Sequence, residues 1–145
     1  LLWNGKLVTT AARAKEVQKL AEKYITLAIN SYKDTVVVEK TKIVNGQATT
    51  VKVVNDGATK LAARRKLMAG LADLQEARRD KETATEYKVR TKTVRHPLIE
   101  KMFNDYAPKF DAKTSENGQK GGYTAIYKMN ARRGDGAEMA TIVVL

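Results

Sequence analysis

The sequence predicts an α+β domain in which helices lie on one face of a small sheet, with an added antiparallel β-hairpin. Two patterns support this fold class. Apolar side chains between residues 11 and 32 recur every three or four positions, which is the period of an amphipathic helix. Runs of β-branched and aromatic side chains at residues 35–54 and 121–145 are interrupted by short Gly-containing stretches, as in strands joined by turns.

The chain is expected to begin with a short strand and a long helix. The strand at residues 7–10 follows an Asn-Gly turn signal. Thr9 or Thr10 is the expected N-cap of a helix over residues 11–32. Arg13 lies in the first turn of this helix, beside free backbone N–H groups, so contact with a phosphate is as much expected as exposure to solvent.

A long β-hairpin is predicted at residues 35–56. Two β-branched runs flank the Asn45-Gly46 dipeptide, which is the strongest short-range signal for a hairpin turn. Isolated two-stranded hairpins are marginally stable, so these arms need a third strand or a partner surface. Residues 83–95 alternate between uncharged and charged side chains, which predicts that third strand. We therefore expect the three segments to form their own small antiparallel sheet.

Two further helices and a closing pair of strands complete the predicted fold. The first helix spans residues 58–78, where Gly70 costs roughly 1 kcal/mol relative to Ala and would be explained by a close packing contact. The second begins at Pro97 and is expected to be kinked or shortened at Pro108. A polar loop at residues 111–122 then leads into the last two strands.

The turn between the two closing strands is rich in Gly and Arg. Gly134 and Gly136 allow the backbone to take positive φ and to curl tightly. Arg132 and Arg133 would then lie at a strand end, where a planar guanidinium can donate two hydrogen bonds to phosphate oxygens. This pattern predicts a turn that faces RNA.

The composition indicates a polyanionic partner, either a nucleic acid or an anionic membrane. The chain has 145 residues, which suits a single domain over residues 1–145, and 27 Lys and Arg against 16 Asp and Glu give a net charge of +11. Each of five successive segments of the chain (1–35, 36–56, 57–82, 83–110 and 111–145) is net positive, as in proteins embedded in folded RNA. A merely soluble basic domain is the plain alternative.

No motif in the sequence predicts catalysis, a cofactor or a metal site. The chain has no Cys, and its single His, His96, lacks the partners that catalysis would need. The Gly-rich stretch 118–122 lacks Walker spacing and precedes a strand, and Arg133-Gly134-Asp135 is an ordinary turn sequence rather than an adhesion tripeptide. No membrane-spanning run or signal-peptide pattern is found, which favours a soluble cytosolic protein. Since the first residue is Leu rather than Met, something upstream is expected to be absent from this chain.

Two other classes of function fit the sequence less well. An RNA-processing enzyme would need clustered carboxylates for Mg²⁺ or an acid–base pair, whereas the acids here are scattered and mostly face cations at helical spacing. A DNA-binding regulator would need a recognition helix and usually a dimer seam, and the sequence indicates neither.

Four blocks of the chain, in order and with matching spacing, resemble the bacterial large-subunit ribosomal protein L17 family. The block near the C-terminus is the most specific. The blocks are residues 4–10 with 13–17 and 23–28; residues 61–65; residues 98–103 with 107–110; and residues 121–124 with 132–137 and 139–140.

The resemblance implies a small three-stranded mixed sheet packed against helices, and no enzymatic activity or cofactor. It implies a place on the large subunit, with contacts to ribosomal RNA and neighbouring ribosomal proteins near the outer end of the peptide exit tunnel, and neither a membrane nor a small-molecule substrate. Carried over residue by residue, it implies RNA contacts through the hydroxyls and cations of Thr9, Thr10, Arg13, Arg64, Arg65, Lys120, Arg132 and Arg133.

The chain departs from the family pattern in two respects. The family usually begins with a basic arm and a helix ahead of Asn4, for which only Leu1 and Leu2 could be a remnant. The hairpin at residues 35–56 replaces a short basic turn, and the predicted strand at residues 83–95 lies in a segment that is longer than expected, so both are interpreted as insertions.

Overall fold

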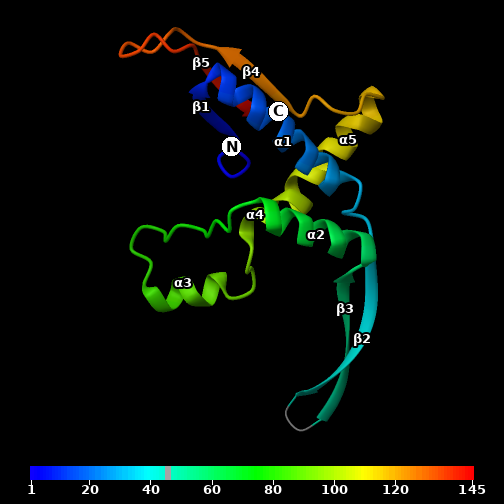
Figure 1. The fold of residues 1–145 in the computed structure, drawn as a ribbon. Helices are drawn as coiled ribbons and strands as arrows, with labels where there is room; N and C mark the ends of the chain where they lie inside the picture. The colour runs from blue at the N-terminus through cyan, green and yellow to red at the C-terminus, as the bar shows by residue number, and fades with distance from the viewer. Residues whose placement is uncertain (45–46) are drawn as a thin grey trace.

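A long helix, α1, lies at the centre of the fold and packs against both the sheet and the other helices (Figure 1). The computed structural model describes residues 1–44 and 47–145. In chain order the elements are β1 (Lys6–Thr10), α1 (Ala11–Ile29), β2 (Thr35–Val44), β3 (Gln47–Asp56), α2 (Ala58–Gly70), α3 (Ala84–Thr91), α4 (Pro97–Lys101), the π-helical turn η1 (Met102–Tyr106), α5 (Ala107–Asn117), β4 (Thr124–Lys128) and β5 (Met139–Val144).

The three-stranded sheet has the order β1–β5–β4, with β5 in the centre. β5 runs antiparallel to both neighbours: Thr10 pairs with Met139, and Lys128 pairs with Ala140. The α+β class is confirmed, but the expectation of a mixed sheet is wrong. β4 and β5 are consecutive strands joined by a loop, and such a connection joins antiparallel strands, whereas parallel neighbours need a longer crossover.

α1 covers one face of this sheet. Its Ala14 packs against Ala140 and Ile142 of β5, and all three are buried. The small alanines let the helix backbone approach the strand closely. The other face carries Val8 and Tyr127, which remain 53% and 57% exposed. As expected, the helices therefore lie on one side of the sheet.

The second half of α1 packs against the remaining helices and forms the main core. Ile25, Leu67, Met102 and Phe110 are the largest side chains buried there. The Phe110 ring lies between two tyrosines, with ring centres 6.2 Å from Tyr106 and 4.9 Å from Tyr123. This core joins α1, α2, η1, α5 and the start of β4.

α2 ends at Gly70, so the predicted extension to residue 78 is wrong. The next residue, Leu71, has extended backbone angles, and residues 72–79 form no helix or strand. Gly70 lies against the Tyr24 hydroxyl so closely that a Cβ atom would overlap it. The predicted close packing contact at Gly70 is confirmed, and the glycine also marks where the helix stops.

The helix that begins at Pro97 continues to Asn117 through the π-helical turn η1. Pro108 does not shorten it, because Pro108 lies in the first turn of α5, directly after that turn. A π-helical turn changes the hydrogen-bond register and so helps accommodate a residue without an N–H. The predicted loop over residues 111–122 is therefore wrong for residues 111–117. Gly118, with φ of 68°, ends the helix.

The hairpin is confirmed, but its expected third strand is not. β2 and β3 pair antiparallel from Thr35 opposite Asp56, while the predicted turn at Asn45-Gly46 lies outside the described residues. Residues 83–95 contain helix α3 rather than a strand. Thr83 and Glu86 form a capping box, in which each side chain accepts a hydrogen bond from the other residue's backbone N–H. That local signal outweighs the alternation, and β2 and β3 form a separate two-stranded sheet.

Candidate nucleic-acid interface

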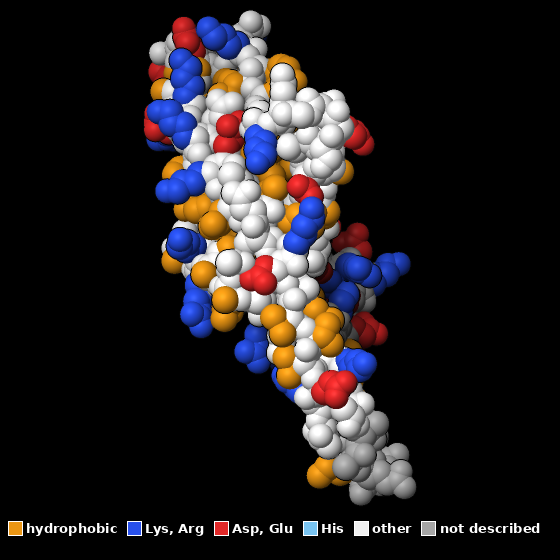
Figure 2. All heavy atoms as spheres, turned by 90° about the vertical axis from the view of Figure 1, so that its right-hand side faces the viewer, with side chains coloured by type: hydrophobic (Ala, Val, Ile, Leu, Met, Phe, Trp, Pro, Cys, Tyr) orange, Lys and Arg blue, Asp and Glu red, His pale blue; other side chains and the backbone are white. Residues whose placement is uncertain are grey.

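Basic side chains cover much of the surface, and carboxylates neutralise some of them. Figure 2 shows Lys and Arg side chains over most of one face, with Asp and Glu between them. Within the described part of the chain, ion pairs with acidic side chains engage Lys19, Lys33, Lys52, Lys60, Arg64, Arg90 and Arg132. The remaining exposed cations are better placed to meet an external anion.

The first predicted group lies at one end of the three-stranded sheet. The backbone N–H of Ala11 donates to the carbonyl of Glu138 at 2.9 Å, which joins the start of α1 to the end of the loop 129–138. Thr9 and Thr10 are the last residues of β1, and Arg13 follows in the first turn of α1. Thr10 is the N-cap, as predicted, but its side chain donates no capping hydrogen bond and accepts none. The fold thus brings Thr9, Thr10 and Arg13 to the end of the sheet from which this loop extends (Figure 1).

Arg132 and Arg133 have different surroundings within this loop. Arg132 donates to both carboxylate oxygens of Asp135, at 3.0 Å from Nε and 2.6 Å from Nη2, and this pair lowers the pKa of Asp135. Gly136, with φ of 66°, donates its N–H to the Arg132 carbonyl at 2.9 Å and closes the turn. Arg133 is exposed and has no ion pair among the described residues. Arg132 therefore shapes the turn, and Arg133 is presented outward.

Thr9 and Arg13 also line a shallow hollow of about 430 Å³ between β1 and α1. Glu16, on the same side of α1, is paired with Lys19 at 3.1 Å rather than with Arg13. The Arg13 guanidinium is therefore available at this hollow.

Arg64 is largely enclosed by intramolecular contacts. Its side chain is 19% exposed and donates to Asp56 and to Glu100, both at 2.5 Å. The guanidinium also lies over the Phe103 ring, 5.2 Å from its centre. Arg64 thus ties the end of β3 to α2 and α4. Its neighbour Arg65 is exposed and makes no ion pair in the described part of the chain.

Lys120 lies apart from the loop 129–138. It precedes β4, whereas the loop follows β4, so the two are at opposite ends of that strand. Lys120 is exposed, and its charge helps to lower the pKa of Asp111, although hydrogen bonds from Lys33 and Tyr32 dominate that shift. The eight predicted residues are therefore distributed over three places: the end of the sheet, α2, and the segment before β4.

Sequence reasoning missed one basic surface. Lys23 of α1 and Lys66 of α2 lie on a groove of about 550 Å³ between the two helices. Lys15 and Lys19 precede Lys23 at intervals of four residues, which places the three on one side of α1. This spacing is visible in the sequence, but helical lysines usually form a solvated face. Only the packing of α1 beside α2 shows that Lys66 extends the row.

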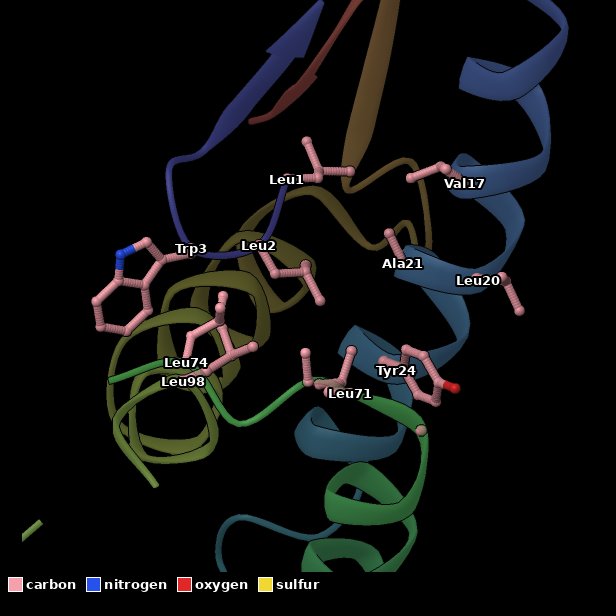
Figure 3. A pocket seen from close by; sticks show the side chains of 12 residues that line it. Leu1, Leu2, Trp3, Val17, Leu20, Ala21, Tyr24, Leu71, Leu74 and Leu98 are labelled. Carbon is pink, nitrogen blue, oxygen red and sulfur yellow. The ribbon is translucent and has the colours of Figure 1, made fainter. Parts of the chain in front are cut away.

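An apolar hollow lies beside the N-terminal segment. It measures about 300 Å³ and lies between the N-terminal segment, α1 and the stretch after α2 (Figure 3). Apart from Trp3 and Tyr24, the side chains of its lining residues are purely aliphatic, and none of them is a carboxylate, an imidazole or a lysine amine. In the described residues, no group of acidic or His side chains could hold a metal ion, and no helix could cross a membrane.

The chain is similar to known proteins of one family. The family described as ribosomal protein L17 matches residues 1–145. The large ribosomal subunit protein bL17 of Lachnospira eligens is 36% identical, over 94% of this chain and 82% of its own length. The bL17 proteins of Ruminiclostridium cellulolyticum and Oenococcus oeni are 34% and 32% identical, each over 98% of this chain and over 84% and 79% of their lengths. The resemblance in the four sequence blocks is confirmed, and the chain belongs to the ribosomal protein L17 family.

Proposed function

We propose that this protein is a structural constituent of the bacterial large ribosomal subunit and acts in the cytoplasm as part of the ribosome. It binds large-subunit ribosomal RNA near the peptide exit tunnel, contacts neighbouring large-subunit proteins, and catalyses no reaction. One observation supports this most strongly: in the part of the chain that the structure describes, exposed cations without carboxylate partners lie at the sheet end, on α1 and on α2. Such a protein holds RNA segments together by neutralising phosphates on several sides.

The roles of the individual residues follow from their surroundings. Thr9 and Thr10 donate hydrogen bonds to the RNA backbone, while Arg13, Arg133 and Arg65 bind phosphates. Arg132 and Lys120 contribute at the turn and before β4, and the groove lined by Lys23 and Lys66 receives a further backbone segment. For Arg64 we propose a structural role, because its donors already bind two carboxylates.

Binding to isolated large-subunit RNA should weaken steeply as salt is added. Each phosphate contact releases counterions, so with roughly five or more contacts the slope of log affinity against log salt should be about −4 or steeper. The measurement is a filter-binding or fluorescence titration at several salt concentrations. A flat response would rule out the electrostatic mechanism.

The double variant Arg132→Ala with Arg133→Ala should weaken RNA binding and leave the melting temperature nearly unchanged. Both side chains are exposed, so they contribute little to the core. The melting temperature and the RNA affinity are measured on the same preparations. Lys113→Ala, another exposed cation at a site for which no RNA contact is proposed, is the control. Lost stability with intact affinity would show that the two arginines are structural.

A further inference from the structure

The two-stranded sheet of β2 and β3, here called the hairpin arm, projects away from the helices, at the end of the molecule opposite the loop 129–138 (Figure 1). None of its residues belongs to either hydrophobic core cluster of the described chain. Stability of the domain therefore does not explain why the arm is long and rich in β-branched side chains.

The root of the arm is fixed to the start of α2 on both strands. Before β2, the Asp34 carboxylate accepts hydrogen bonds from the Thr59 hydroxyl and from its N–H, the latter at 2.8 Å, and so caps α2. At the end of β3, Asp56 binds Lys60 at 3.1 Å and Arg64 at 2.5 Å. Two separate sets of bonds thus define the direction in which the arm leaves the body.

One face of the arm is largely apolar, and its two charged side chains form an ion pair. Val37 and Val54 pair directly opposite each other and are 61% and 64% exposed. Further along the same face, Glu39 lies opposite Lys52, with 3.7 Å between Glu39 Oε1 and Lys52 Nζ. Thr41 then lies opposite Thr50. We call this face, with Val37, Val54, the Glu39–Lys52 pair, Thr41 and Thr50, the valine face.

The chemistry of the valine face fits a protein and not RNA. Its one lysine is paired with a glutamate, so no uncompensated cation is left on it for a phosphate. RNA-binding surfaces are strongly positive, whereas the centres of protein–protein interfaces are apolar and poor in charge. A solvated hairpin with aliphatic side chains on its open face is also only marginally stable, which a covering surface would correct.

We propose, building on the assignment to the large subunit, that the hairpin arm docks through its valine face onto an apolar patch of a neighbouring large-subunit protein. The rigid root presents the arm in a set direction, and Val37 and Val54 form the centre of the contact. The arm thereby joins two proteins, while the opposite end of the molecule, with Arg133, contacts RNA.

Site-specific photo-cross-linking in purified large subunits tests this inference. A photoreactive amino acid replaces Val37 in one variant and Arg133 in a second. Irradiation should link position 37 to one large-subunit protein and position 133 to RNA. An RNA adduct at position 37, or no protein adduct there while position 133 reacts, would overturn the proposal. A protein adduct at 37 without an RNA adduct at 133 would keep it and refute the RNA contact instead.

A matched pair of double variants supplies an independent measurement. Val37→Ser with Val54→Ser, the valine variant, removes the apolar centre. Val36→Ser with Val51→Ser, the control variant, removes two exposed valines from the opposite face of the arm. In competition with the unmodified protein for assembly into large subunits, the valine variant should lose roughly tenfold in occupancy. The control variant should compete equally with the unmodified protein, and neither variant should change the affinity for isolated RNA. Equal competition by the valine variant, or loss of its affinity for RNA alone, would contradict protein docking.

Discussion

Replacing Phe110 by alanine should lower the free energy of unfolding by roughly 3–5 kcal/mol, the range measured when a buried aromatic side chain is truncated. Phe110 is 1% exposed and lies between the rings of Tyr106 and Tyr123. Its removal would leave a cavity where α5, η1 and the start of β4 meet, and these elements are held by core packing on α1. Urea denaturation followed by circular dichroism measures the loss.

Tyr127→Ala is the matched control for this prediction. Tyr127 is also aromatic but is 57% exposed, on the uncovered face of the sheet, so its loss should cost less than about 1 kcal/mol. The urea dependence of the unfolding free energy should stay similar in both variants, because neither changes the area exposed on unfolding by much. Equal losses in the two variants would contradict the assigned core.

Local patterns predicted those elements whose signals do not compete. The apolar period of α1, the β-branched runs of β2 and β3, and the closing strands each point to one structure, and each is confirmed. α2 was overestimated because apolar residues such as Leu71 and Leu74 continue the helical period past Gly70. The helix ends at Gly70, whose contact with Tyr24 joins segments far apart in the chain.

Residues 83–95 show how two local signals can conflict. Alternation of charged and uncharged residues favours a strand, yet Thr83 and Glu86 have the spacing of a capping box. The helix also gains a partner network, since Arg90 binds Glu76 and Glu82 and lowers the pKa of Glu82 to about 2. Glu76 and Glu82 both precede residue 83, so the sequence of residues 83–95 alone does not show these two partners of Arg90.

The sequence was enough to predict which residue types form the candidate interface, but not which other side chains surround each of them. Arg64 and Arg65 are neighbours in one basic run, and nothing local separates them. Asp56 precedes Arg64 by eight positions and Glu100 follows it by 36, so only the folded chain reveals that Arg64 is already bound. The row from Lys23 to Lys66 depends in the same way on two helices that meet in space.

Substitutions of the adjacent residues Arg64 and Arg65 should affect different properties, the first the stability of the fold and the second RNA binding. Arg64→Ala should cost roughly 1–3 kcal/mol of stability, because it leaves Glu100 without its cation and Asp56 with Lys60 alone. It should leave the salt dependence of RNA binding unchanged. Arg65→Ala should leave stability within about 0.5 kcal/mol and reduce the slope of log affinity against log salt by about 1.

The loss of stability caused by Arg64→Ala should also depend on pH in a defined way. Burial alone would raise the pKa of Asp56, but hydrogen bonds from Arg64 and Lys60 outweigh burial and lower it. A carboxyl whose pKa is lowered by folding stabilises the native state above its unfolded pKa of about 3.9 and loses that contribution as the pH falls. Urea denaturation should therefore show the full gap between Arg64→Ala and the unmodified protein at pH 7, and a smaller gap at pH 3. A stability gap that stays constant between pH 7 and pH 3 would contradict the contribution assigned to the Asp56–Arg64 pair. A salt slope altered by Arg64→Ala and not by Arg65→Ala would reverse the roles assigned to the two arginines.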